Sequence, residues 1–283
     1  MAETINISCK TPANVADTLS KTTCVQKTHN VDWKLIILGI MAGFYIGFGG
    51  AIATLVSSDA AKFVGYGLSR FFVGAVFSVG LMLVVIAGAE LFTGNNLMLM
   101  GVLEKRVKLN QVLYKWGVVY AANFIGSIFL AWLMYQSNLW KSNDFATGIA
   151  ALKIANVKIG LTWMEAFIRG VLCNILVCLA VWMALSCQQT VGKIWAIFFP
   201  IMTFVALGFE HSVANMYFIP LGIFLKGSGA AAAAGLDLAN LGWRNFFMNN
   251  LIPVTLGNIV GGAFFVGALY WLVYVRADKK EIA

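Results

Sequence analysis

Two acidic side chains stand in the middle of long stretches that are otherwise uncharged. Glu90 lies in the segment GAELFTGN at 88–95, and Glu210 lies in GFEHSVAN at 208–215. Both segments follow the pattern G-x-E-x4-N, and the two glutamates are 120 residues apart. Because a buried carboxylate needs hydrogen bonds or a counter-charge, each glutamate is predicted to fix an irregular loop. The other residues expected to stabilise these loops are Gly94, Asn95 and Asn215.

A hydroxyl and an imidazole accompany the two carboxylates. Thr93 follows Glu90 by three residues, and His211 follows Glu210 directly. Histidine changes its charge near neutral pH, so it can lend or accept a proton under mild conditions, and a hydroxyl can hydrogen-bond an oxyanion. Thr93 and His211 are therefore predicted to hold a small oxyanion or to exchange a proton with it. The alternative is that the imidazole is a structural hydrogen bonder.

One lysine stands at the edge of a later uncharged stretch. Lys158 precedes the stretch that begins at residue 170. Most lysines in such positions snorkel toward water, but a lysine at a pore mouth can also concentrate anions there as an electrostatic funnel. Spacing alone leaves both interpretations open.

The composition indicates that a membrane must position these residues. The chain has 283 residues, of which 60% are hydrophobic and 11% charged, and its mean hydropathy is +0.82. Soluble domains carry roughly 25% charged residues, and a helix needs about 20 apolar residues to cross a bilayer. Six elements meet this requirement, namely 35–56, 71–103, 116–140, 170–192, 194–225 and 245–275.

The second and fifth elements are too long for one straight crossing. Each would be about 50 Å long, against a hydrocarbon core of about 30 Å, and each carries its glutamate near the middle. We therefore expect both to be broken, with the freed backbone amides donating to Glu90 and Glu210 and the exposed helix N-termini favouring an anion.

The broken elements divide the chain into two halves of equal design. Each half is ordered unbroken, broken, unbroken, and an Asn-x-x-Gly sequence at 123–126 is repeated at 258–261. Because three crossings is an odd number, the halves must be inverted relative to each other, as in many transporters and channels. The predicted fold is an all-α membrane protein of six transmembrane helices in two inverted three-helix repeats.

Several functional classes are excluded by the residues present. The net charge of +8 is spread among short loops, so it does not indicate nucleic-acid binding. The five cysteines form no CxxC pair, so neither a metal site nor a disulfide framework is predicted. With no nucleophile–base pair, metal-ligand cluster or phosphate loop in the sequence, we predict neither an enzyme nor a cofactor.

The predicted organisation has three parts. A polar tail (1–32) precedes a membrane domain (33–276) made of the repeats 33–140 and 160–276, and a short tail (277–283) follows. An even number of crossings places both termini on one side. That side holds more lysines and arginines, so the positive-inside rule places both termini in the cytoplasm.

The sequence resembles the formate/nitrite transporter family, most closely its formate channels. The segments that carry the resemblance are GFYIGFGG (43–50), AELFTGN (89–95), GFEHSVANM (208–216) and NLIPVTLGN (250–258). The resemblance implies an aquaporin-like protomer, assembled as a homopentamer in a prokaryotic inner membrane with one pore per protomer. Members of the family pass small monovalent anions such as formate, nitrite, hydrosulfide or acetate.

The resemblance also implies roles for particular residues. Lys158 matches a vestibule lysine, which favours the funnel, and Asn174 and Asn258 match amides that line the pore or support the histidine. The residues implied in apolar constrictions are Leu91 together with Phe204, and Phe77 in a second constriction facing the cytoplasm. The tail 1–32 does not carry the resemblance, so no gating role is assigned to it.

These observations together predict a formate channel or formate–proton symporter. A bare charge in an apolar pore costs at least about 2.5–3.5 kcal/mol. Protonation of the anion by or through His211 would remove that charge, while Thr93 hydrogen-bonds the carboxylate. The alternatives are a nitrite or hydrosulfide channel of the same family, and a neutral-solute pore, which would leave Lys158 and His211 without a role.

Overall fold

The computed structural model describes residues 9–277, and its regular elements in that range are helices. Several are short α-, 3-10- or π-helical pieces that continue one another. The elements are α1 (Pro12–Asp17), η1 (Thr18–Thr23), α2 (Cys24–His29), α3 (Asp32–Ser57), α4 (Ala60–Phe77), α5 (Val79–Met82), η2 (Leu83–Gly88), α6 (Phe92–Asn95), η3 (Asn96–Met98), α7 (Leu99–Leu103), α8 (Leu109–Gln136), η4 (Leu139–Lys141), α9 (Ala146–Ile159), α10 (Trp163–Ser186), α11 (Thr190–Leu207), α12 (Ser212–Leu225), α13 (Gly229–Ala234), α14 (Trp243–Asn245), η5 (Phe246–Leu251), α15 (Ile252–Ile259), η6 (Val260–Ala268), α16 (Leu269–Trp271) and η7 (Leu272–Arg276).

Six helical runs are long and apolar enough to cross a membrane, as predicted. They are Asp32–Ser57, Ala60–Gly88, Leu109–Gln136, Trp163–Ser186, Thr190–Leu207 and Trp243–Arg276. The second begins at Ala60 rather than at 71, and it is kinked at Gly65, which has φ +75° and lies between Lys62 and Arg70. Long cationic side chains can keep their charge at the interface while their stems lie along apolar surface.

Both predicted breaks are present. Helical structure stops at Ala89–Leu91 in the second element, and it stops between Leu207 and Ser212 in the fifth. Gly88 has φ +93° and Gly208 has φ +76°. This left-handed region is strongly disfavoured for residues with a Cβ. The glycine of each G-x-E-x4-N segment therefore turns the chain out of the helix.

The two halves pack in equivalent ways. Gly126 on α8 lies against the carbonyl oxygen of Ile40 on α3, and Gly261 in η6 lies against that of Val171 on α10. Each approach is so close that a Cβ on the glycine would overlap the carbonyl. The repeated Asn-x-x-Gly sequence thus marks one helix crossing in each half, and the predicted inverted repeat is confirmed.

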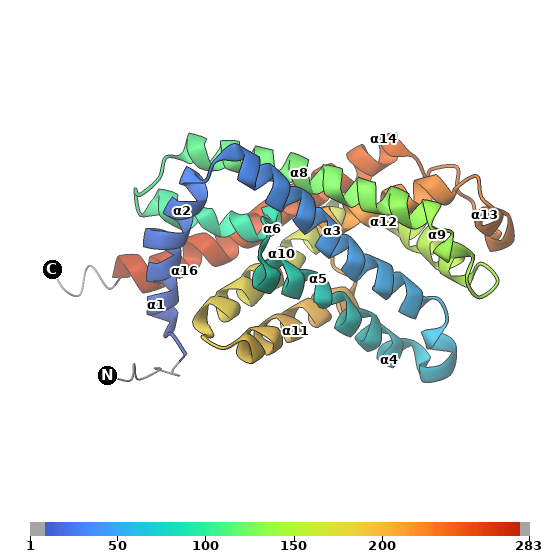
Figure 1. Cartoon of the computed structure of the whole chain (residues 1–283), viewed down its shortest axis with the longest axis horizontal. Helices are drawn as coiled ribbons and strands as arrows, with labels where there is room; N and C mark the ends of the chain where they lie inside the picture. Colours follow the sequence, from blue (N-terminus) through green and yellow to red (C-terminus); the bar gives the residue numbers. More distant parts are fainter. Residues whose placement is uncertain (1–8, 278–283) are drawn as a thin grey trace.

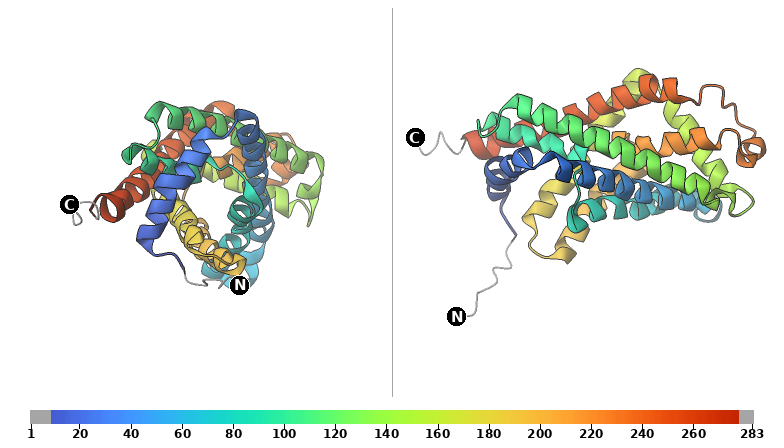
Figure 2. Two further views of the ribbon diagram at one scale, coloured as in Figure 1. Left: turned by 60° about the vertical axis from the view of Figure 1, so that its left-hand side comes forward. Right: turned by 45° about the horizontal axis from the view of Figure 1, so that its top comes forward.

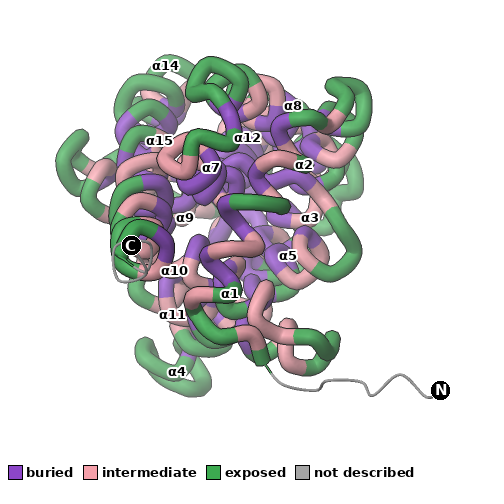
Figure 3. Tube along the Cα trace, turned by 90° about the vertical axis from the view of Figure 1, so that its left-hand side faces the viewer, coloured by how far each residue is buried: buried purple, intermediate pink, exposed green. Residues whose placement is uncertain are grey.

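Residues 12–29 form a packed segment, although they were predicted to be a polar tail. This N-terminal segment, α1 to α2, lies across the end of the molecule near which both chain ends emerge (Figures 1 and 3). Its side chains Val15, Leu19 and Cys24 are buried. The elements α9 (146–159) and α13 (229–234) lie side by side at the opposite end (Figures 1 and 2). The remaining tail residues, 1–8 and 278–283, lie outside the described residues.

Candidate functional site

The two breaks meet in the interior of the molecule. Thr93 lies in α6, just after the first break, and His211 is the N-cap residue of α12. Thr93 Oγ1 lies 2.9 Å from His211 Nε2, and both side chains are buried. A hydrogen bond therefore joins the two halves of the chain at the residues that were singled out for proton chemistry.

One ring nitrogen of His211 is committed to the backbone. Nδ1 accepts the N–H of Ala214 at 3.0 Å, so in this network Nδ1 carries a lone pair rather than a proton. The proton of the neutral imidazole is then assigned to Nε2, which donates to Thr93 Oγ1. The Thr93 hydroxyl keeps its own O–H as a donor. A second proton on Nδ1 would break the cap of α12.

At the first break, Glu90 is held by a lysine and an asparagine. Lys27 Nζ lies 2.6 Å from Glu90 Oε2, and Asn95 Nδ2 donates to the same oxygen at 2.8 Å. Lys27 comes from α2, so the N-terminal segment supplies the counter-charge of the break. The carboxylate is buried, and this pairing compensates its charge.

At the second break, Glu210 is held in the same way. Lys158 Nζ lies 2.9 Å from Glu210 Oε1, and Asn215 Nδ2 donates to Oε2 at 2.6 Å. Asn250 Nδ2 is a further donor to Oε2 at 3.3 Å. Within residues 9–277 no three histidine, cysteine or carboxylate side chains come together as metal ligands, so these clusters serve as charge pairs.

The freed backbone amides do not bond the glutamates, which corrects our expectation. The N–H of Phe92 donates to Asn123 Oδ1, and the N–H of Ser212 donates to Asn258 Oδ1, both at 2.9 Å. An amide side chain suits this position better than a carboxylate, because it also donates to nearby carbonyls. The glutamates are left to pair with the lysines.

Asn174 and Asn258 brace the backbone and line none of the cavities described below. Asn258 Nδ2 donates to the carbonyl oxygens of Gly170 and Glu210 at 2.8 and 3.0 Å. Asn174 Nδ2 lies 3.2 Å from the carbonyl oxygen of Thr93 and 2.7 Å from that of Asn258. Both asparagines are fully buried and hold the two breaks against the spans around them.

A cavity of about 100 Å³ reaches the histidine from the α9 end of the molecule. We call it the Lys158 cavity. Its polar and charged lining residues are Ser57, Arg70, Lys158 and His211, and its aromatic ones are Phe77, Phe204, Phe209 and Phe218. Lys158 Nζ also lies 5.4 Å from the centre of the Phe218 ring, which is a cation–π contact. Positive charge and aromatic surface thus both line this cavity.

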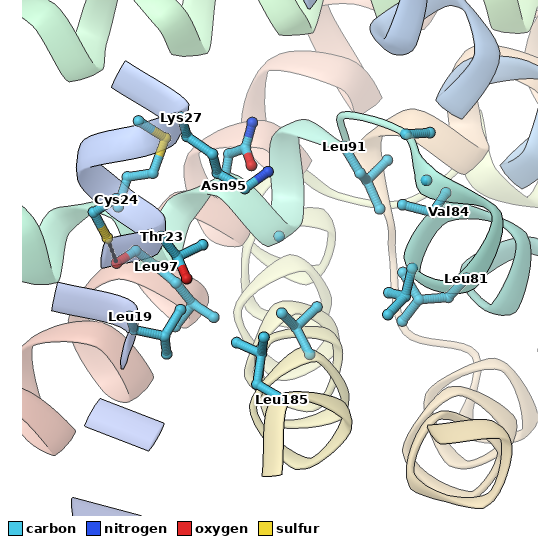
Figure 4. A pocket seen from close by; sticks show the side chains of 16 residues that line it. Leu19, Thr23, Cys24, Lys27, Leu81, Val84, Leu91, Asn95, Leu97 and Leu185 are labelled. Atoms are coloured by element: carbon cyan, nitrogen blue, oxygen red, sulfur yellow. Dashed lines mark hydrogen bonds between the residues drawn. The ribbon is translucent and has the colours of Figure 1, made fainter. Parts of the chain in front are cut away.

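A second cavity, of about 210 Å³, opens on the side of the N-terminal segment. We call it the Lys27 cavity (Figure 4). Leu19, Thr23 and Cys24 line one end of it, near Lys27, and the pair Leu81 and Leu91 lies at the other (Figure 4). Its lining is mostly apolar, and its charged residue, Lys27, is paired with Glu90.

A small apolar pocket of about 10 Å³ lies between the two cavities. It shares Leu81 with the Lys27 cavity, and it shares Phe77, Phe204 and His211 with the Lys158 cavity. The rings of Phe77 and Phe204 meet edge to face with centres 5.8 Å apart. The phenylalanines are therefore grouped with each other on the Lys158 side, whereas Leu91 lines the Lys27 side. This differs from the implied grouping of Leu91 with Phe204 and of Phe77 toward the termini.

Sequence reasoning missed several residues of the site. They are Lys27, Arg70, Leu81 and Asn123. A signal for Lys27 was present, because Lys27 precedes Lys158 by 131 residues. The same offset separates Gly39 from Gly170, whose carbonyl oxygens accept equivalent hydrogen bonds from Asn123 and Asn258. An alignment of the two halves extended into the N-terminal tail would have found it.

Comparisons with known proteins agree with one another. A family model described as formate/nitrite transporter matches residues 14–272. The chain is 44% identical over 285 residues to a probable formate transporter of Methanothermobacter thermautotrophicus, which covers 95% of this chain and 98% of that relative. It is 38% identical over 263 residues to the formate channel FocA of Haemophilus influenzae, with 91% and 92% covered. Among solved structures it is similar to a pentameric formate channel with formate bound, with a TM-score of 0.78 and 39% identity over 86% of this chain and 98% of that one.

Proposed function

The chain belongs to the formate/nitrite transporter family, and we propose that it carries formate across a membrane. It is a multi-pass membrane protein, by its six apolar spans and its family. The observation that carries the proposal is the Thr93–His211 hydrogen bond at the meeting point of the two breaks, beside the small pocket that separates the two cavities. The formate channels among its relatives support the choice of substrate.

The proposed path runs through the Lys158 cavity, the small apolar pocket and the Lys27 cavity. The cations of the Lys158 cavity attract the anion, and the aromatic wall beyond them discourages its passage as a charge, at a cost of about 2.5–3.5 kcal/mol or more. His211 lines the pocket, and the Thr93 hydroxyl bonded to it, which lines none of the three cavities, carries the O–H that would bind a carboxylate oxygen. The apolar constriction lined by Phe77, Phe204 and Leu91 would then let formate pass as the neutral acid, or as the anion only during a brief opening.

The hydrogen bonds of His211 limit how it can supply a proton. If neutral His211 gave up its Nε2 proton through Thr93 while Nδ1 stayed unprotonated, it would become an anion in a buried site, which is unfavourable. A proton relay therefore requires Nδ1 to be protonated first and to release the N–H of Ala214. Proton coupling is thereby linked to loosening of the α12 N-terminus.

The assembly and orientation are also part of the proposal. A pentameric formate channel is a structural neighbour, and a homopentamer with one pore per protomer is proposed here by analogy. The excess of cations on the side of the termini supports a cytoplasmic Lys27 cavity in a prokaryotic cell membrane. We also propose that residues 12–29 belong to the membrane domain functionally, because Lys27 completes the first break.

The relay is tested with the His211→Asn variant, purified and reconstituted into liposomes. Asparagine is a good N-cap, so its Oδ1 can still accept the N–H of Ala214, but it has no titratable proton. Wild-type uptake of labelled formate is expected to be faster at pH about 5.5 than at about 7.5, since the proposed relay requires protonation of Nδ1, which the lower pH favours. His211→Asn is expected to lose that pH dependence and at least about tenfold of the rate at the lower pH. A variant with the pH dependence of the wild type would contradict the relay.

The same liposomes distinguish the substrate and the role of the hydroxyl. Thr93→Val removes the O–H at nearly constant volume and is expected to slow formate uptake as much as His211→Asn does. Thr54→Val is the matched control, because Thr54 is a buried threonine that bonds the carbonyl oxygen of Gly50 away from the site. Stronger uptake of nitrite than of formate would indicate a nitrite channel instead, and swelling in glycerol without anion uptake would indicate a neutral-solute pore.

A further inference from the structure

The Lys158 cavity is lined by two cations, and they differ in their partners. Lys158 forms an ion pair with Glu210 at 2.9 Å, so most of its charge is compensated. Arg70 lines the same cavity. In the part of the chain that the structure describes, no carboxylate forms an ion pair with the Arg70 guanidinium. Arg70 therefore contributes the positive charge of the cavity that has no counter-charge beside it.

Arg70 is bound to the C-terminal end of α11. Its Nε donates to the carbonyl oxygen of Ala206 at 3.0 Å, and its Nη2 donates to that of Val205 at 2.5 Å. The last carbonyls of a helix carry a partial negative charge, which would repel an anion at this mouth. The guanidinium covers that end and replaces it with a positive surface. The φ of +76° at Gly208 turns the chain away from this end of α11. The guanidinium lies close to that turn, since a Cβ added to Gly208 would be 3.5 Å from Arg70 Nη2.

The Arg70 guanidinium has further N–H donors beyond the two that bond α11. It carries five N–H groups in a fixed planar fork, and the two hydrogen bonds to α11 engage only part of them. A planar carboxylate is the ligand whose geometry matches such a fork. The bonds to α11 hold the side chain in place, so binding an anion there costs little side-chain entropy.

We propose that Arg70 is the group that attracts and first binds the transported anion in the Lys158 cavity, while Lys158 acts mainly as the counter-ion of Glu210. This rests on the proposed function and identifies the residue that sets the affinity at one mouth of the pore. The Lys27 cavity has no equivalent. The position matched to Arg70 in the repeat is Thr190, and the charged residue lining that cavity is the paired Lys27. The two mouths therefore differ in charge.

The proposal is tested by measuring formate uptake against formate concentration for wild type, Arg70→Gln and Arg70→Lys in liposomes. Arg70→Gln is expected to raise the half-saturating concentration about tenfold, within the range of electrostatic effects on ligand capture, with little change in the maximal rate. Arg70→Lys keeps the charge but not the planar fork, so its half-saturating concentration is expected to lie between those of wild type and Arg70→Gln. The matched control is Lys62→Gln, which removes a cation from the same helix at an exposed site outside the cavity, and is expected to behave as wild type.

Raised ionic strength gives a second readout. The difference in half-saturating formate concentration between wild type and Arg70→Gln is expected to become smaller as salt is added. The reason is that the Debye length falls from about 30 Å at 0.01 M salt to about 3 Å at 1 M. An unchanged half-saturating concentration in Arg70→Gln would overturn the proposal. Equal losses in Arg70→Gln and Arg70→Lys would also overturn it, because the capping geometry rather than the charge would then matter.

A variant with intact Arg70 keeps the proposal testable if Arg70→Gln fails to fold. Lys158→Met combined with Glu210→Gln removes the ion pair that helps to hold the second break, so a lower maximal rate is expected, but the net charge of the cavity region is unchanged. Its half-saturating concentration is expected to keep the wild-type salt dependence, and loss of that dependence would assign the attraction to Lys158. If wild-type protein carries no formate under any of these conditions, the proposed function fails. If wild-type protein carries formate and Arg70→Gln has the same half-saturating concentration, only the proposal for Arg70 fails.

Discussion

Asn123 and Asn258 form equivalent hydrogen bonds at the two breaks. Each accepts the first free N–H of a resumed helix on Oδ1 and donates through Nδ2 to carbonyl oxygens on both sides, and neither is exposed. An interrupted helix inside a membrane is tolerated only where its polar backbone groups find partners. These two side chains therefore satisfy the backbone of the breaks beside Thr93 and His211.

Replacement of Asn258 is expected to destabilise the second break. Asn258→Leu removes the acceptor of the Ser212 N–H and the donor to the carbonyl oxygens of Gly170 and Glu210. Each buried group left without a partner costs about 1–3 kcal/mol, so we expect a clear fall in the melting temperature of the detergent-solubilised protein. The measurement is a thermal unfolding curve by circular dichroism.

A half-buried asparagine on α9 separates bracing from a general effect of the substitution. Asn156→Leu removes a single bond, to the carbonyl oxygen of Asp237 near the exposed end of α9, and is expected to change the melting temperature little. If Asn258→Leu were as stable as Asn156→Leu, the bracing role would be refuted.

At the scale of the helices, the sequence sufficed to predict the crossings and the breaks. Apolar length gave six elements, and the paired motifs at 88–95 and 208–215 located both interruptions, because glycine, carboxylate and asparagine in mid-membrane are costly without a reason. The partners of the carboxylates could not be predicted in the same way. Lys27 lies 63 residues before Glu90, in a segment too polar to be recognised as part of the membrane body.

The grouping of the constriction residues was beyond sequence reasoning for another reason. Whether Phe204 meets Phe77 or Leu91 depends on the rotation of α11 about its axis, and a helix that is apolar on all sides gives no periodic signal for that rotation. The capping of α11 by Arg70 fixes one end of the helix relative to α4. That contact joins residues 136 apart and has no local pattern in the sequence.

The crossing of α3 and α8 makes a prediction about glycine. A Cβ on Gly126 would overlap the carbonyl oxygen of Ile40, whereas a Cβ on Gly117, in the same helix, has no neighbour within 4 Å. Gly126→Ala is expected to cost about 1–3 kcal/mol through overpacking, and Gly117→Ala to gain up to about 1 kcal/mol from helix propensity. Opposite shifts in melting temperature are the expected result. Shifts of the same sign and size would mean that the crossing is looser than described.

At the scale of the whole molecule, the N-terminal segment completes the symmetry. Lys27 on α2 pairs with Glu90 as Lys158 on α9 pairs with Glu210, so α2 and α9 are equivalent elements that close the two ends. One precedes the first repeat, and the other precedes the second. In the sequence the first looks like a tail because few of its side chains are apolar, yet it is packed into the end of the molecule where the Lys27 cavity opens (Figure 3).

The reactivity of two cysteines in one chain tests whether this segment is docked in solution. Cys24 is 1% exposed and its thiol donates to the carbonyl oxygen of Leu97, whereas Cys9 is exposed. Burial raises the pKa of the Cys24 thiol to about 11, outweighing the opposing effects of a backbone hydrogen bond from Gly101 and of nearby Lys27. At pH 8 only about one thiol in a thousand would then be thiolate, compared with roughly a quarter for an unperturbed cysteine. Because the thiolate is the form that reacts, iodoacetamide should label Cys9 and leave Cys24 nearly unmodified when peptides are quantified by mass spectrometry. Labelling of Cys24 at the rate of Cys9 would mean that α2 leaves its place readily, and Lys27 could not then be the standing counter-charge of Glu90.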